Sequence, residues 1–174
     1  YMGLAVKKQK RQEERFTYKD YLAWDDDERW EIIDGAAYDM SPAPNTVHQL
    51  VSMELVFLLK SQLTENPCRV IAAPFDVRLP LGAEKEEDIV NVVQPDISVI
   101  CDSKKLDKKG CLGAPDIIIE ILSPATSRKD RLEKFNLYEQ AGVKEYWLVS
   151  PEDKIVEIFR TGDDGRFTRP EIYC

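Results

Sequence analysis

The feature that most constrains this chain is an apolar run near its middle that contains a single acidic residue. Residues Asp116 to Leu122 read DIIIEIL, and a near-continuous apolar segment of this kind is typical of a strand buried on both faces. Glu120 interrupts that strand. An isolated buried carboxylate is strongly unfavourable, so Glu120 must be paired, protonated or bound to a cation. The run therefore predicts a buried strand in which Glu120 has either a salt-bridge partner or a metal ion.

A second acidic residue, Asp96, opens another predicted strand. This strand runs from Asp96 to Cys101 and directly follows Pro95. If the two strands are neighbours, the carboxylates of Asp96 and Glu120 could surround one hard cation such as Mg²⁺. The simpler interpretations stay open: a buried salt bridge for Glu120, and a turn or strand-end role for Asp96.

A lysine in the second long helix is the third candidate. The pattern predicts a helix over residues 128–141, closed by Gly142 at its C-cap. At about 100° per residue, Lys134 falls on the buried arc of this helix, whereas Lys129 falls on the solvated arc. A lysine that faces a sheet needs an anion. That anion is either Asp130, one turn earlier, or the acidic pair, or a substrate phosphate.

The remaining elements follow from periodicity and turn signals. We expect a helix from Thr17 to Trp24, a hairpin around Asp34-Gly35, and a largely buried helix from Thr46 to about Leu63. Further strands are predicted over residues 69–79, 144–149 and 154–159. This order predicts an α/β fold with a central mixed sheet, one helix packed on each face, and an N-terminal hairpin. Residues 1–15 are expected to form a flexible arm, and residues 16–174 a single domain.

The charges of the chain give conflicting indications about nucleic acid. The chain has 24 Lys and Arg against 32 Asp and Glu, a net charge of −8, which opposes binding to a polyanion. Basic residues nevertheless cluster in Lys104–Lys109 and in Arg128–Arg131, and a bound metal ion would offset part of the local negative field. We therefore expect a local basic rim from these two segments around the acidic site.

Length and composition limit the class of protein. The 174 residues suit one domain, and no apolar run approaches the roughly 18 residues of a membrane span. Since the N-terminus also lacks a signal-peptide pattern, we expect a cytoplasmic protein without a membrane partner. The four cysteines are expected to be free thiols. His48, the single histidine, argues against chemistries that need two histidines, such as zinc proteolysis.

Several segments together resemble the Uma-type restriction endonucleases of the PD-(D/E)xK nuclease superfamily. The resemblance covers roughly residues 17–160. It rests on residues 94–99 (QPDISV), residues 113–124 (GAPDIIIEILSP), Asp130 with Lys134 and Tyr138, residues 142–147 (GVKEYW), residues 30–35 (WEIIDG), residues 40–42 (MSP), and His48. Each segment alone is weak evidence for the family, but their combination is specific for it.

The resemblance implies a restriction endonuclease-like fold with an αβββαβ core and a site for one or two Mg²⁺ or Mn²⁺ ions. Asp96 and Glu120 match the two acidic residues of the motif, with the backbone carbonyl of Ile121 as a further metal ligand. The motif's lysine position holds Leu122, so Lys134 is expected to take the lysine's place. Glu31 and His48 are expected to border the site or to bind substrate. The simpler interpretations stay open: an exposed strand residue for Glu31, and a role in capping or packing the N-terminus of a helix for His48.

The implied activity is metal-dependent hydrolysis of DNA phosphodiester bonds. Cutting both strands of a duplex would favour a homodimer. Two alternatives stay open from the sequence. One is a nuclease-fold module that binds its partner without catalysis, and the other is a metal-dependent hydrolase of a different substrate.

Overall fold

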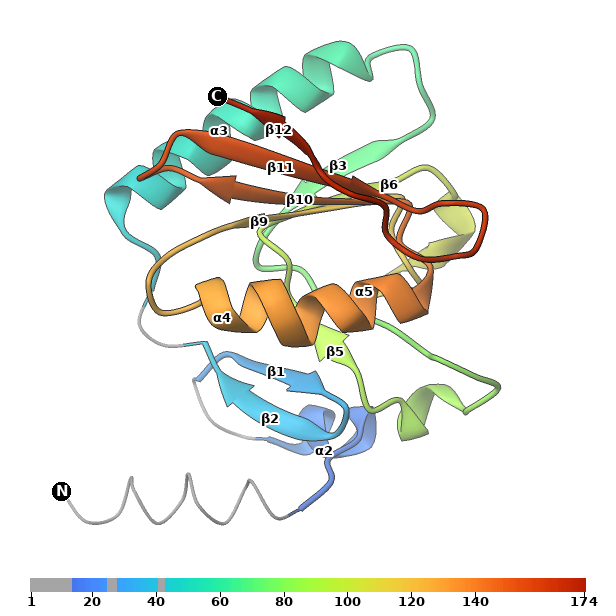
Figure 1. Cartoon of the computed structure of the whole chain (residues 1–174). Coiled ribbons are helices and arrows are strands. Elements are labelled where there is room, and N and C mark those ends of the chain that lie inside the picture. Colours follow the sequence, from blue (N-terminus) through green and yellow to red (C-terminus); the bar gives the residue numbers. More distant parts are fainter. Residues whose placement is uncertain (1–13, 25–27, 41–42) are drawn as a thin grey trace, which may run out of the picture.

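The computed structural model describes residues 14–24, 28–40 and 43–174 (Figure 1). It contains two six-stranded sheets with three helical segments of a turn or more around them. The helices are α2 (Tyr18–Ala23), α3 (Thr46–Gln62), and a continuous helix made of α4 (Ser127–Lys129), the π-helical turn η3 (Asp130–Lys134) and α5 (Phe135–Ala141). The short turns η1 (Glu86–Asp88) and η2 (Ser103–Lys105) lie in loops. The predicted arm mostly lies outside the described residues.

The central sheet carries the apolar run that the sequence singled out. Its strand order is β12-β11-β10-β9-β6-β3, and the β9–β10 pair is parallel whereas the others are antiparallel. Its strands are β3 (Arg69–Ala72), β6 (Ile97–Ile100), β9 (Ile117–Ile121), β10 (Glu145–Ser150), β11 (Ile155–Arg160) and β12 (Glu171–Tyr173). In β9, Ile118 contributes to one core cluster and Ile119 to another. The prediction of a strand buried on both faces is therefore confirmed.

One helix covers each face of the central sheet, as the sequence predicted (Figure 1). On one face, α3 packs Leu55 and Leu59 against the cluster that contains Ile119. On the other face, Leu137 and Tyr138 from α5 join the cluster that contains Ile118. Because side chains alternate along a strand, Glu120 points to the same face as Ile118 and so towards the helix that carries Lys134.

The expectation that helix Thr46–Gln62 is largely buried was wrong. No residue of α3 is fully buried, and Leu50, Met53 and Phe57 are 64–70% exposed. The physical reason is that the sheet covers only one side of this helix, while apolar residues occur around most of its circumference.

The predicted hairpin is present and belongs to a second sheet, which the sequence did not predict. This hairpin sheet has the order β2-β1-β5-β4-β8-β7. Its strands are β1 (Trp30–Ile33), β2 (Ala36–Asp39), β4 (Val77–Arg78), β5 (Val92–Val93), β7 (Leu106–Asp107) and β8 (Gly110–Leu112). Asp34 and Gly35 both have positive φ, at 48° and 78°, as the tight turn requires.

The predicted strand over residues 69–79 is divided between the two sheets. β3 ends at Ala72 in the central sheet, and Val77–Arg78 form β4, which pairs with β5 and β8 in the hairpin sheet. The apolar pattern continues through both pieces, so it gave no sign that the chain changes sheet between them.

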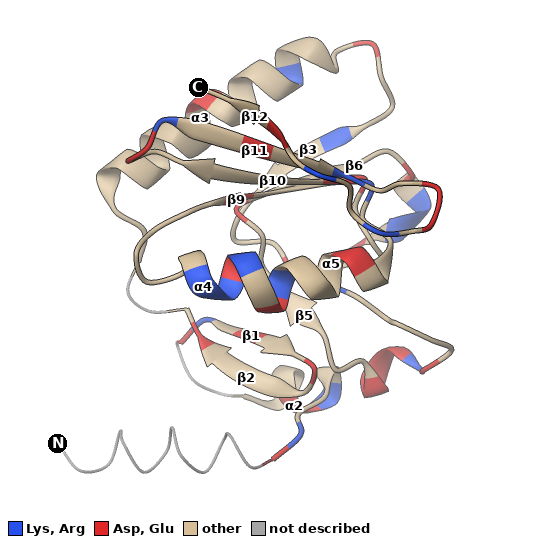
Figure 2. Cartoon of the chain, viewed as in Figure 1, with Lys and Arg blue, Asp and Glu red and all other residues tan. Residues whose placement is uncertain are grey.

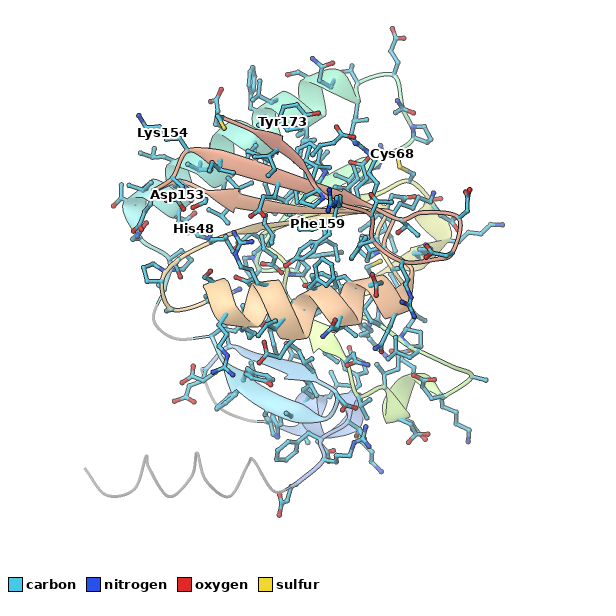
Figure 3. All side chains as sticks on the ribbon, in the orientation of Figure 1. His48, Cys68, Asp153, Lys154, Phe159 and Tyr173 are labelled. Atoms are coloured by element: carbon cyan, nitrogen blue, oxygen red, sulfur yellow. A yellow bond between two sulfur atoms is a disulfide. The ribbon has the colours of Figure 1, made fainter. Side chains whose placement is uncertain are left out.

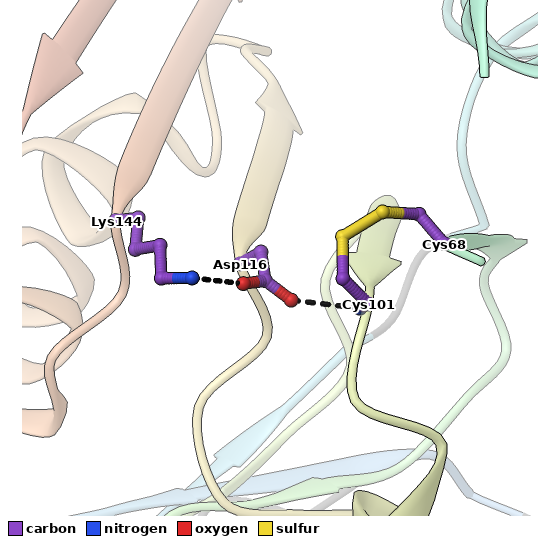
Figure 4. The surroundings of a disulfide bond; sticks show 4 residues. All are labelled: Cys68, Cys101, Asp116 and Lys144. Carbon is purple, nitrogen blue, oxygen red and sulfur yellow. Dashed lines mark hydrogen bonds and ion pairs between the residues drawn. A yellow bond between two sulfur atoms is a disulfide. The ribbon is translucent and has the colours of Figure 1, made fainter. Parts of the chain in front are cut away.

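Two of the four cysteines form a disulfide, which corrects the expectation of free thiols. Cys68 is bonded to Cys101 (Figure 4). β3 and β6 pair with Arg69 opposite Ile100, so the next positions outward place the two cysteines opposite each other. Their separation of 33 residues in sequence hides this proximity. Cys111 and Cys174 are free thiols.

Candidate active site

The two predicted metal ligands come from neighbouring segments: Glu120 lies in β9, and Asp96 directly precedes β6. β6 and β9 pair antiparallel with Ile97 opposite Ile119, and the next position along this register places Asp96 opposite Glu120. Directly opposed residues project to the same face of a sheet. Asp96 is also held at this point by its side chain, whose Oδ2 accepts a hydrogen bond from the N–H of Ile121 at 2.7 Å. The Ile97–Ile119 pair and this hydrogen bond hold Asp96 beside the end of β9, and the charge of Asp96 helps to raise the pKa of Glu120.

Each of these carboxylates is held through one oxygen. Both donors to Glu120, the Lys134 ammonium and the Tyr138 hydroxyl, contact Oε1 at 2.8 Å. Both donors to Asp96, His48 Nε2 at 3.1 Å and the Ile121 N–H, contact Oδ2. Among the described residues, no donor contacts Oε2 of Glu120 or Oδ1 of Asp96. The arrangement leaves one oxygen on each side chain for a cation.

Lys134 points inward, and its ammonium bridges two acidic side chains. Its Nζ lies 2.8 Å from Glu120 Oε1 and 2.8 Å from Glu31 Oε1, and the side chain is only 3% exposed. Asp130, the simpler partner considered from the sequence, is more distant at 3.8 Å. The ammonium thus joins β9 of the central sheet to β1 of the hairpin sheet.

Lys129 corrects the helical-wheel assignment, which placed it on the solvated arc. Its Nζ contacts Glu31 Oε2 at 2.7 Å and lies 5.5 Å from the centre of the Tyr38 ring. The reason is the π-helical turn at residues 130–134. Hydrogen bonds from i to i+5 align residues five apart, so both Lys129 and Lys134 reach Glu31. A wheel drawn at the α-helical angle could not show this.

Glu31 is the most enclosed acid of the group. It has no solvent exposure, and besides the two lysines it accepts the N–H of Gln94 at 3.0 Å. Burial alone would raise the pKa of Glu31, but the neighbouring ammonium groups of Lys134 and Lys129 outweigh it and lower the pKa to about 2. Glu31 is therefore a buried anion, and the alternative of an exposed strand residue is wrong.

The cluster has more carboxylates than ammonium groups. Asp96, Glu120, Glu31 and Asp130 face two lysines, Lys129 and Lys134. Burial raises the pKa of Glu120 to about 8, with Asp130, Asp96 and Glu31 adding to the rise and Lys134 opposing it. The negative excess keeps the pKa of Lys134 well above its ordinary value in spite of burial. Such a site favours an additional cation.

His48 lies beside Asp96 at the start of α3. Asn45 caps the helix by accepting the N–H of His48, and the imidazole Nε2 contacts Asp96. Figure 3 shows His48 on the α4 side of the first turn of α3. The hydrogen bond to Asp96 raises the pKa of His48, burial opposes the rise, and the charge of Asp96 adds to it. The Nδ1 atom is buried without a partner among the described residues.

The donor set fits a hard divalent cation. Within the described ranges, no group of three or more His, Cys, Asp or Glu side chains is arranged to hold a metal ion. Mg²⁺ does not require such a group, because it keeps several waters and is commonly bound through one or two carboxylates. The free oxygens of Asp96 and Glu120 meet that need. The backbone carbonyl of Ile121 as a third ligand stays a prediction.

The expected basic rim is divided between distant parts of the molecule. In Figure 2 the basic residues of α4 and those of η2 lie at opposite ends of the central sheet. In the Lys104–Lys109 segment, Lys105 donates to the carbonyl of Ala114 and Lys109 pairs with Glu86. Near the site, Arg131 pairs with Glu157, and Arg128 is exposed. Among the described residues, the ammonium groups that contact the acidic cluster come from the helix that begins at Ser127.

Comparison with known proteins places the fold in the restriction endonuclease-like class. A crystal structure from Anabaena variabilis, described as "a putative nuclease belonging to DUF820", superposes with a TM-score of 0.71 at 22% identity, over 91% of this chain and 84% of that chain. The chain belongs to the Uma2 family, described as "Putative restriction endonuclease", whose model matches residues 18–173. A relative from Synechocystis sp., "Uncharacterized protein slr1290", is 27% identical over 154 residues, which are 87% of this chain and 77% of that protein. Family and fold therefore support a nuclease-like function.

Proposed function

We propose that this protein is a metal-dependent endonuclease that hydrolyses DNA phosphodiester bonds at Asp96, Glu120 and Lys134. The proposal is supported by Asp96, which is held beside the end of β9, and by Glu120 in that strand: among the described residues, each has one carboxylate oxygen that no donor contacts. Membership of the Uma2 family supports the reaction class.

In this proposal Asp96, Glu120 and the carbonyl of Ile121 hold Mg²⁺ or Mn²⁺. A bound ion of this kind lowers the pKa of its water and neutralises charge on the scissile phosphate. Glu120 would hold the ion as a carboxylate, because a metal ligand must be deprotonated. Lys134 stays protonated between Glu31 and Glu120 and offers N–H donors to the extra negative charge of the pentacovalent transition state.

His48 and Glu31 border this chemistry in different ways. His48 helps to fix the orientation of Asp96 by contacting Oδ2, and no donor among the described residues contacts Oδ1. Glu31 contacts both lysines and no predicted metal ligand, so it acts on the site through them. A homodimer, with one site for each strand of a duplex, completes the proposal.

The test is cleavage of supercoiled plasmid DNA in Mg²⁺ or Mn²⁺, with EDTA as the metal-free control. The wild-type protein should nick or linearise the plasmid, and Asp96→Asn and Glu120→Gln should each abolish cleavage. Glu54→Gln, on the exposed side of α3, is the matched carboxylate control and should cleave normally. Equal cleavage by the wild type and Asp96→Asn would show that this site does not carry the activity.

A binding module without catalysis is the second candidate. It is favoured by Leu122 at the motif's lysine position, where the catalytic lysine would be expected. In that case the wild-type protein should shift duplex DNA in a mobility-shift assay. It should not cleave that DNA when Mg²⁺ or Mn²⁺ is added. Binding through phosphates would weaken steeply as salt rises.

A further inference from the structure

We propose that Glu31 is the positioning residue of this site: it holds Lys134 between two carboxylates and thereby leaves Glu120 free to bind a cation. The inference rests on the proposed function, because it concerns the same metal site. It assigns a role to a residue that touches neither the predicted metal ligands nor the substrate.

The first step is that the side chain of Glu31 is buried and held at both carboxylate oxygens. It lies in β1, which pairs with β2 on one side and β5 on the other. Its side chain has no exposure, and it receives Lys134 and the Gln94 N–H on Oε1 and Lys129 on Oε2. A carboxylate with donors on both oxygens and no contact with water is a fixed anion.

The second step is that Lys134 is shared equally. Its Nζ lies 2.8 Å from Glu31 and 2.8 Å from Glu120, and both contacts end on a single oxygen of each acid. The Tyr138 hydroxyl occupies the same Oε1 of Glu120. The strong donors to Glu120 are therefore all on one oxygen, and no donor among the described residues contacts Oε2.

The third step is that loss of the negative charge of Glu31 would change how Lys134 pairs with Glu120. The acids that then remain within 4 Å of the ammonium are Glu120 and Asp130, so Lys134 is drawn more strongly to Glu120. A tightly paired ammonium competes with a divalent cation for the same carboxylate. Partners outside the metal's own ligands commonly change metal affinity by about 10–100-fold when they are altered.

Lys129 has the opposite effect within this arrangement. It neutralises the second oxygen of Glu31 at 2.7 Å, which weakens the pull of Glu31 on Lys134. Its side chain is 18% exposed against 3% for Lys134. Removing the charge of Lys129 should therefore move Lys134 towards Glu31 and strengthen cation binding at Glu120.

The experiment measures Mn²⁺ binding to the full chain by isothermal titration calorimetry, without DNA. Glu31→Gln keeps the shape of the side chain and loses its charge, and we expect Mn²⁺ affinity to fall about tenfold or more. The Mn²⁺ concentration for half-maximal plasmid cleavage should rise in the same ratio, with a smaller change in the rate at saturating Mn²⁺. Glu31→Asp should recover part of the affinity, and Glu54→Gln should bind Mn²⁺ as the wild type does.

A double-mutant cycle separates positioning from the plain loss of a nearby negative charge. If Glu31 acts through Lys134, Glu31→Gln should have little further effect on Mn²⁺ affinity in a Lys134→Met background. An equal loss in both backgrounds would overturn the inference, as would unchanged Mn²⁺ affinity in Glu31→Gln or a wild type that binds no Mn²⁺.

Lys129→Met keeps the inference testable if Glu31→Gln does not fold, since Lys129 is partly exposed. Here Mn²⁺ affinity should rise, and a fall would contradict the proposed role of Glu31. The variants could show the expected changes in Mn²⁺ affinity while the wild type cleaves no nucleic acid. That result would refute the proposed nuclease activity and leave the role of Glu31 intact.

Discussion

Glu120 and Lys134 show how far single residues could be assigned from the sequence. An acid inside an isoleucine run must have a partner when buried, so Glu120 was identified by the cost of burying its charge. Lys134 was found because it interrupts the apolar arc of its helix. Lys129 was missed, because its inward direction depends on a π-helical turn that has no clear signal in the residue pattern. The fixed, buried position of Glu31 depends on a second sheet that was also not predicted.

Lys134 gives the first prediction at the residue scale. Lys134→Met should reduce cleavage by about 10²–10³-fold, the scale seen when one preorganised charge-stabilising group is lost. It should also lower the free energy of unfolding by about 3–5 kcal/mol, because Glu31 and Glu120 lose a buried partner. Plasmid cleavage and urea denaturation measure the two effects. Lys108→Met, at an exposed position, is the matched control, and similar losses in both variants would refute the assignment.

Glu120 predicts a pH dependence of stability. Burial raises its pKa to about 8 in the folded protein, from an ordinary value of 4.5. The folded state then holds a proton that the unfolded state releases, so this contribution to stability is complete below pH 4.5 and is lost as pH rises towards 8. The free energy of unfolding of Glu120→Gln, measured without metal, should therefore increase relative to wild type between pH 5 and 8.5. A constant or falling difference would contradict the raised pKa.

At the scale of elements, most helices and strands were predictable but their neighbours were not. As predicted, a helix begins after Thr17, and the left-handed Gly142 ends the helix that carries Lys134. The exposed side of α3 was missed, because periodicity shows which residues are apolar without showing which other elements pack against them. The placement of β4 in the hairpin sheet was missed for the same reason, since the apolar pattern does not show which strand pairs with which. The pairing of β3 with β6, which brings the cysteines together, is likewise a long-range property.

The disulfide gives a prediction for those two strands. It closes a loop of 33 residues, so its loss should lower the free energy of unfolding by about 3–4 kcal/mol on the chain-entropy scale. Urea denaturation of Cys68→Ser, and of the wild type in dithiothreitol, should show this decrease. Cys174→Ser, which removes an exposed free thiol, should leave stability unchanged. A wild type insensitive to dithiothreitol and equal in stability to Cys68→Ser would argue against the bond.

At the scale of the whole molecule, the helix that carries both lysines lies between the two sheets (Figure 1). Glu31 belongs to the hairpin sheet and Glu120 to the central sheet, and Lys134 contacts both. The charged cluster therefore links the two layers across the helix. In the described part of the chain, no helix is long and apolar enough to cross a membrane.

Metal binding at this junction should stabilise the whole fold. A ligand that binds only the folded state at about 100 times its Kd adds about 2.7 kcal/mol, so saturating Mn²⁺ should raise the melting temperature of the wild type. Asp96→Asn should lose most of this rise, whereas Glu54→Gln should keep it. Differential scanning fluorimetry measures the shift, and an equal rise in Asp96→Asn would show that Mn²⁺ binds elsewhere.

The central claim is that Asp96 and Glu120 share one divalent cation. It is tested most directly by anomalous diffraction from crystals grown with Mn²⁺. We predict a peak within about 2.0–2.6 Å of both Oδ1 of Asp96 and Oε2 of Glu120, with Lys134 still in contact with Oε1. A peak at other residues, or no peak between these two carboxylates at millimolar Mn²⁺, would contradict the claim.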